Sequence, residues 1–328
     1  MPSFAAIVIA AFTWGIGYTF TSGATQAWLS DEIGEGNANA LMLRVGVLQR
    51  YLGFLVIPLS VLLAFSSLQI PIVVGGIGFL SLAAFLMFTM PETNFRPHPH
   101  ARQGVFAGMK ATLLEALRFA RDNATLRTVF IVTMVFGAAS ESFDRLWQVH
   151  LLNFGMPRLE SLLGIVALSE AQSLLIGFAA INLSVTLVGL PLAQWTTRIN
   201  AGDPRAVARA LLLVTAGLGG SLVAFALSPN LTLAVVAYIA ARVCRDVHGP
   251  LSGAWLNQRL EPSTRATVLS LNGQADAVGQ IAGGPLIGAL GNASLRLALL
   301  CGSGILAACL PLYNRASNLG TKDAHATD

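Results

Sequence analysis

The stretch Leu126–Leu152 reads LRTVFIVTMVFGAASESFDRLWQVHLL and carries charged residues inside an otherwise apolar segment. Its length exceeds the roughly 20 apolar residues that a helix needs to cross a bilayer. Glu141, Asp144 and Arg145 lie well inside it. A charge at the bilayer centre costs from ~2.5 to more than ~10 kcal/mol, so such residues normally face a polar cavity, a partner or a solute. The stretch therefore predicts a membrane-spanning helix that borders a polar environment.

Eight further apolar stretches of similar length fill most of the 328-residue chain. Only 11% of the residues are charged, whereas soluble globular proteins have roughly 25%. The sequence therefore predicts an all-α polytopic membrane protein that contacts the lipid bilayer along most of its length. The expected spans are Phe4–Thr25, Val45–Phe65, Gln69–Met90, Leu126–Leu152, Gln172–Gln194, Val207–Leu227, Leu231–Trp255, Ala266–Leu290 and Ser294–Tyr313.

Residues 91–125 form one long, basic connection between the third and fourth spans. Within it, Val105–Arg121 has apolar residues at helical spacing, which predicts an amphipathic helix on the membrane surface or a solvated linker helix. If this connection is cytoplasmic, that side receives fourteen of the 20 basic residues and the other side only Arg158 and Arg296. Cytoplasmic loops carry such an excess, so we expect a cytoplasmic C-terminus. Basic residues confined to short loops also argue against nucleic-acid binding.

Several other functional classes lack their sequence signals. Cys244, Cys301 and Cys309 all fall within apolar spans, so the sequence indicates no disulfide framework. There is no His/Cys cluster at metal-ligand spacing, no two-His zinc motif, no Ser/His nucleophile arrangement and no phosphate-binding loop. We therefore expect no metal, no cofactor and no enzymatic activity, and we predict no obligate protein partner.

Four stretches resemble segments of the major facilitator superfamily. Pro91–Thr93 (PET) is similar to the end of the sixth span, and Thr19–Glu32 (TFTSGATQAWLSDE) is similar to the fourth span and following loop of drug-efflux members. Ser140–Trp147 (SESFDRLW) resembles the seventh span of the bacterial drug or macrolide efflux branch. Gly279–Gly288 (GQIAGGPLIG) is similar to the glycine-proline signature of antiporters. The antiporter signature expected in the fifth span is absent from Arg50–Pro58.

The resemblance implies a bundle of two six-helix halves, of which this chain would hold nine of the twelve transmembrane helices. Residues 1–90 would be the remainder of the N-terminal half, spans four to six, and 91–125 a cytoplasmic linker. Residues 126–314 would be the C-terminal half, spans seven to twelve, and 315–328 a cytoplasmic tail. The family's most diagnostic loop, between spans two and three, would precede Met1. We therefore expect the chain to be N-terminally truncated or its start to be misassigned.

The resemblance also implies that spans four, seven and ten line a central cavity, and polar stripes of the sequence fall on these spans. The charges of the seventh span share one helical face, as do those of the tenth. We expect these residues, with aromatic side chains of the fourth span and one carboxylate of the eleventh, to receive a small-molecule substrate and protons. The candidate residues are Trp14, Tyr18, Glu141, Asp144, Arg145, Arg242, Arg245, Asp246 and Asp276.

The charges allow two interpretations. Glu141–Arg145 and Arg242–Asp246 are i,i+4 pairs that could neutralise each other and only stabilise the fold, and a contact between Glu141 and Arg242 is a further option. The four carboxylates, however, outnumber the three arginines. The remaining carboxylate could carry a proton, and Asp144 or Asp276 is the best candidate. Alternatively, Asp276 makes a structural hydrogen bond on its own helix face, to Asn272 or Gln280.

Glycines repeat at four-residue spacing in the eleventh span. The pairs Gly279/Gly283 and Gly284/Gly288 match the small-xxx-small pattern that lets two membrane helices approach closely. We expect this stretch to pack against another helix, and a gating hinge near Pro285 is the alternative.

These observations favour a secondary-active exporter of small amphipathic compounds, driven by protons and working by alternating access in the bacterial cytoplasmic membrane. Two alternatives stay open. The first is proton-coupled uptake of a nutrient or organic anion, with Arg242 and Arg245 holding a carboxylate. The second is a non-functional transporter fragment. Transport direction rests on the family resemblance alone.

The protein isolated from its native membrane should have an intact mass well above 34.4 kDa. The excess mass should correspond to about 100 residues, because each missing span with its loop adds roughly 20–30 residues. Mass spectrometry of the intact protein measures it. A mass of 34.4 kDa would contradict the expected truncation and favour partnership or degeneration.

Overall fold

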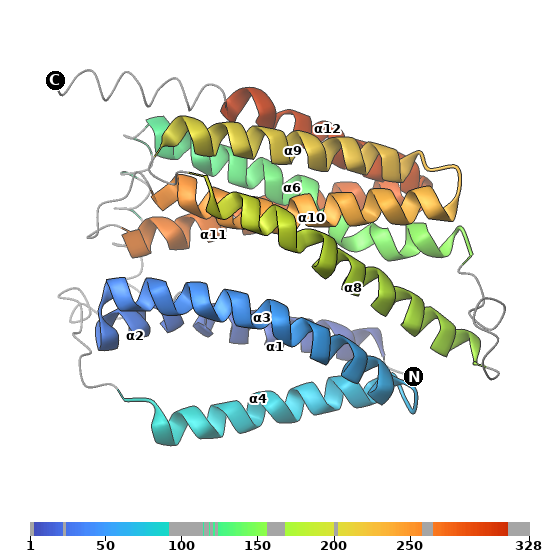
Figure 1. The fold of residues 1–328 in the computed structure, drawn as a ribbon, viewed down its shortest axis with the longest axis horizontal. Coiled ribbons are helices and arrows are strands. Elements are labelled where there is room, and N and C mark those ends of the chain that lie inside the picture. Colours follow the sequence, from blue (N-terminus) through green and yellow to red (C-terminus); the bar gives the residue numbers. More distant parts are fainter. Residues whose placement is uncertain are drawn as a thin grey trace. The chain divides into compact units, whose positions relative to one another are not determined.

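A computed structural model describes residues 3–21, 24–91, 114, 118, 121, 124–155, 168–199, 203–257 and 265–313. Every regular element in these ranges is a helix (Figure 1). The all-α prediction is therefore confirmed for the described part of the chain. The predicted amphipathic helix Val105–Arg121 lies almost wholly outside these residues, as does the predicted tail 315–328.

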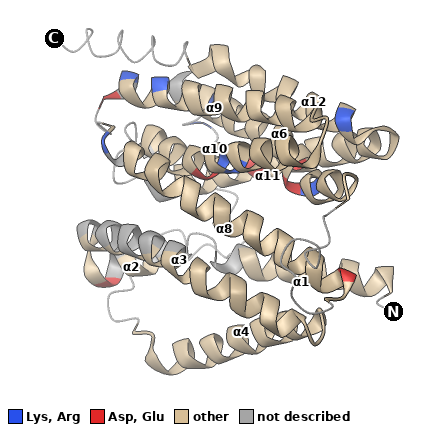
Figure 2. Ribbon diagram, turned by 45° about the vertical axis from the view of Figure 1, so that its right-hand side comes forward, with Lys and Arg blue, Asp and Glu red and all other residues tan. Residues whose placement is uncertain are grey.

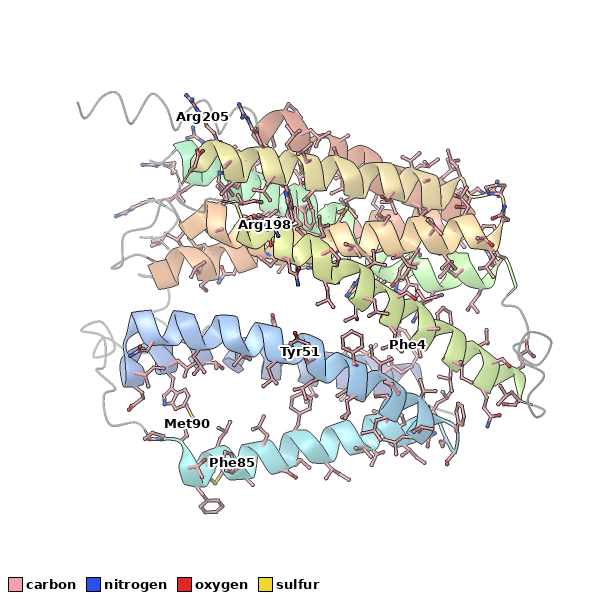
Figure 3. The ribbon with its side chains drawn as sticks, in the orientation of Figure 1. Phe4, Tyr51, Phe85, Met90, Arg198 and Arg205 are labelled. Atoms are coloured by element: carbon pink, nitrogen blue, oxygen red, sulfur yellow. The ribbon has the colours of Figure 1, made fainter. Side chains whose placement is uncertain are left out.

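The chain divides into two compact units, one of residues 1–52 and 72–114 and the other of residues 53–71 and 115–328. The helices before residue 92 are α1 (Phe4–Thr21), α2 (Ala24–Ile33), α3 (Glu35–Ala64) and α4 (Gln69–Thr89). In the first unit, Trp14 of α1 meets Phe79 of α4 edge to face, with ring centroids 6.0 Å apart. Large apolar side chains there, such as Tyr51 and Phe85 (Figure 3), are exposed.

The described part of the second unit includes six long helices (Figure 1), and buried apolar side chains pack between them. These side chains form two buried clusters. One is centred on Phe225 and Tyr238, and the other on Trp255 and Tyr313. The helices are α6 (Ala124–Leu152), α8 (Glu170–Thr197), α9 (Pro204–Ala226), α10 (Leu231–Asn257), α11 (Arg265–Ala293) and α12 (Leu295–Ala307).

Short polar sequences begin three of these helices. Ser169 forms a capping box with Gln172 at the start of α8. Asp203 caps α9, where Pro204 occupies the first turn, and Ser294 caps α12. Each cap satisfies a backbone N–H that has no partner within its helix. Figure 3 labels Arg198 and Arg205, which flank the connection from α8 to α9.

Five helical segments are long and apolar enough to cross a membrane: Gln69–Thr89, Leu126–Leu152, Glu170–Thr196, Arg205–Ala226 and Leu295–Tyr313. This indicates a membrane-embedded protein. Each of the nine predicted spans overlaps a helix, but nine crossings remain a prediction. Among the described residues, α1 and α3 contain only shorter apolar segments. Charged residues interrupt α10, and polar residues such as Asn272 and Gln280 interrupt α11.

The backbones of α6 and α11 approach each other closely at glycine positions. A methyl group added at Gly279 would overlap the carbonyl of Met134, and one added at Gly283 would overlap that of Ala138. The close packing predicted for this glycine pair is therefore confirmed. The second predicted pair behaves differently, because nothing lies within 4 Å of a methyl group at Gly288.

Gly279→Ala should destabilise the protein by about 1–3 kcal/mol, because the added methyl group forces the α6 and α11 backbones apart. Gly288→Ala is the matched control on the same helix. It should be neutral or stabilise by up to about 1 kcal/mol, because alanine favours helix and the site is open. Thermal unfolding in detergent measures both. Equal melting temperatures for the two variants would contradict the α6–α11 contact.

Candidate functional site

The centre of the candidate site is Asp144 of α6, which lies between two arginines of α10. Arg245 Nη2 donates a hydrogen bond to Asp144 Oδ2 at 2.9 Å. Arg242 Nη1 lies 4.0 Å from Asp144 Oδ1. These pairs join residues about 100 positions apart in sequence. Figure 2 shows charged residues within the otherwise tan helices of this unit. The Asp144 side chain is 32% exposed, so the cluster borders the surface of the helix bundle.

Both predicted pairs within single helices also form. Arg145 Nε lies 3.2 Å from Glu141 Oε2, and Arg242 Nε lies 3.3 Å from Asp246 Oδ1. Glu141 is buried, whereas the Arg145 side chain is 73% exposed. The suggested contact between Glu141 and Arg242 is wrong, because Arg242 binds Asp144 and Asp246 instead. The interpretation that these pairs stabilise the fold is thus compatible with the geometry.

Asp276 of α11 is the carboxylate of the predicted set that makes no ion pair with any described residue. Gln280 Nε2 donates to Asp276 Oδ2 at 2.8 Å. Asn272, the other predicted partner, instead accepts a hydrogen bond through its Oδ1 from Thr133 Oγ1 at 2.8 Å. The Asp276 carboxylate lies against Gly137 of α6, where no side chain intervenes. Of the two carboxylates that the sequence left as candidates, Asp144 is paired and Asp276 is not.

A layer of aromatic and polar side chains lies behind the cluster, and the sequence analysis did not identify it. The guanidinium carbon of Arg245 is 4.9 Å from the Phe136 ring centroid. The same ring stacks on His248, with centroids 3.8 Å apart. His248 is hydrogen-bonded to Tyr313, and Tyr313 to Thr215. One sequence feature could have indicated His248: it follows Arg245 by three residues, which puts both side chains on one face of α10.

Trp14 and Tyr18 lie on α1 in the first unit, whereas the seven charged candidates lie on helices of the second. Trp14 contacts Phe79, and both predicted aromatic residues are exposed. Their part in a shared cavity remains a prediction. A second aromatic group packs close to the ion cluster, with Tyr238 stacked on Trp147 at 4.5 Å.

The arrangement favours charge recognition over metal chemistry. Among the described residues, no three His, Cys, Asp or Glu side chains are grouped so as to hold a metal ion. The seven charged side chains carry one excess negative charge when all are ionised, and Asp276 carries it without an ion-pair partner among described residues. Such a site can bind a proton or another cation, and its exposed arginines can contact an anion.

Fold and site together define a protein whose described part is helical, with five helices there suited to crossing a membrane and a charged cluster on the helix bundle. Comparison of the chain with protein-family models, curated proteins and solved structures gives no match.

Asp144→Asn should destabilise the protein by about 1–3 kcal/mol, because Arg245 loses its ion-pair partner and Arg242 loses one of two. Asp246→Asn is the matched control, since Arg242 still faces Asp144. Its cost should stay below about 1 kcal/mol, as for other partly exposed ion pairs. Thermal unfolding in detergent compares the two. A larger loss for Asp246→Asn would contradict the central position of Asp144.

Proposed function

We propose that this chain is a secondary-active transporter of the major facilitator type, and that it exports small amphipathic compounds in exchange for protons. The observation that carries the proposal is Asp276, a half-buried carboxylate without an ion-pair partner among described residues, beside a cluster in which Asp144 is doubly paired. Coupled transport needs a group that is both ionisable and accessible to protons. Asp276 meets these requirements best.

The physical argument rests on the difference between paired and unpaired carboxylates. The Asp144 carboxylate faces two arginines, at 2.9 Å from Arg245 and 4.0 Å from Arg242. A proton on Asp276 removes an isolated charge from an apolar helix, and Gln280 can still hydrogen-bond to the neutral group. Arg245, Asp144 and Glu141 are close enough to Asp276 to act on it electrostatically. Proton binding at Asp276 would therefore change the field across the whole cluster.

The surroundings also support an amphipathic substrate. Mixed charges on α6 and α10 are partly exposed, and aromatic side chains such as Trp147 and Tyr238 pack one turn away. A charged face within an apolar bundle does not face lipid without a large cost. We infer that it faces water during part of a transport cycle. The membrane would be the bacterial cytoplasmic membrane, with the C-terminus inside.

A second candidate function is proton-coupled uptake of an organic anion. The observation that favours it is Arg245 Nε, a buried donor without a hydrogen-bond partner among the described residues. The Arg242 side chain is partly exposed next to it. A carboxylate substrate could bind both guanidinium groups, as the sequence also suggests.

Asp276→Asn should reduce proton-linked transport at least about tenfold, because the amide keeps the shape of the carboxylate but cannot ionise. The protein is reconstituted in liposomes that contain a pH-sensitive dye. Ethidium then serves as the amphipathic probe and benzoate as the organic anion. Asp203→Asn, at the exposed cap of α9, is the matched control and should keep the wild-type rate.

Ethidium moving against the proton flux supports export, and benzoate moving with it supports uptake. Wild-type proton-linked transport by Asp276→Asn would overturn the role of Asp276. No proton-linked flux of either probe in the wild-type protein would count against the transporter proposal.

A further inference from the structure

A buried hydrogen-bonded layer from four helices supports one of the two arginines at Asp144. His248 of α10 is only 5% exposed, and its Nε2 lies 2.9 Å from the Tyr313 hydroxyl. Thr215 of α9 donates to the same hydroxyl at 3.5 Å. The His248 ring lies almost parallel to Phe136 of α6, with 7° between the planes. None of these four side chains belongs to the ion cluster.

Burying polar groups in this layer costs free energy unless each finds a partner. The bond between His248 Nε2 and the Tyr313 hydroxyl gives each side chain a buried polar partner and restrains the orientation of the histidine ring. Parallel stacking then fixes the Phe136 ring. The Arg245 guanidinium lies over this Phe136 ring, with its central carbon 4.9 Å from the ring centroid. A cation held over an aromatic ring is attracted by the negative face of the ring.

Arg245 has few other restraints. Its Nη2 binds Asp144, and its Nε has no hydrogen-bond partner among the described residues. Asp276 is the other carboxylate that Arg245 acts on electrostatically. If Phe136 moved, Arg245 could turn towards Asp276, where it would neutralise the charge that Asp276 otherwise carries alone.

We propose that His248 and Tyr313 are positioning residues, which hold Arg245 on Asp144 through the Phe136 ring and thereby keep Asp276 free to exchange a proton. The role of Asp276 in this statement rests on the proposed function. The support of the Arg245–Asp144 pair by the buried layer does not, so it can be tested without transport.

The test is a double-mutant cycle on the whole protein in detergent, with melting temperature as the readout. Tyr313→Phe removes only the hydroxyl, and Asp144→Asn removes the partner of Arg245. If the layer positions Arg245, the double variant should lose less than the sum of the single losses, by about 2 °C or more. The control cycle combines Ser303→Ala with Asp144→Asn. Ser303 donates a hydrogen bond to Gly219 O and is not part of the buried layer. The losses of these two variants should therefore add.

His248→Phe is the second probe variant, because it keeps an aromatic ring against Phe136 but removes the hydrogen bond to Tyr313. It should show the same non-additivity with Asp144→Asn. Additive losses for both His248→Phe and Tyr313→Phe would overturn the positioning role, whatever the transport assay gives. Non-additivity in either cycle, with additivity in the Ser303→Ala control, supports it.

A transport readout then separates positioning from stability. In proteoliposomes, Tyr313→Phe should lower proton-linked ethidium flux several-fold and change the half-saturating ethidium concentration less than twofold. Ser303→Ala should change neither. Loss of flux in Tyr313→Phe, together with a non-additive stability cycle, supports the proposal. An unchanged flux would overturn the link to Asp276, and a wild-type protein without flux would contradict the proposed function and not the positioning of Arg245.

Discussion

The attraction between Asp144 and two arginines of α10 is the constraint on which the charged part of the bundle depends. One carboxylate on α6 faces Arg245 at 2.9 Å and Arg242 at 4.0 Å. It thereby joins two helices whose sequences place charges inside apolar stretches. Without this contact, Arg242 would keep Asp246, but Arg245 would have no ion-pair partner among the described residues, which an apolar bundle tolerates poorly. Because Asp144 takes both arginines, Asp276 is the carboxylate of the set that has no ion-pair partner among the described residues.

The sequence predicted the helices well because apolar runs and polar breaks are local signals. The nine expected spans all overlap helices, and the glycine spacing predicted close packing at Gly279 and Gly283, which the structure places against α6. The i,i+4 pairs were predictable for the same reason, since helix geometry alone brings Glu141 and Arg145 together.

The sequence could not decide between Asp144 and Asp276, because that choice depends on which helices are neighbours. The pairing of Asp144 with Arg242 and Arg245 requires α6 and α10 to be adjacent with their charges at matching heights. His248 was missed for a related reason. Its three-residue spacing from Arg245 puts it on the charged face of α10, but its role emerges only from Phe136 and Tyr313, which are far away in sequence.

The glycine contact between α6 and α11 has a mechanical consequence. Thr133 meets Asn272 and Gly137 meets Asp276, so both helices advance by four residues between contacts and run parallel. Backbones in such close contact cannot slide along each other without collision, since interlocked surfaces resist small displacements. The contacts therefore oppose sliding of α11 along α6 at these residues. Asp276 thus lies on a closely packed helix pair with Asp144 and Glu141.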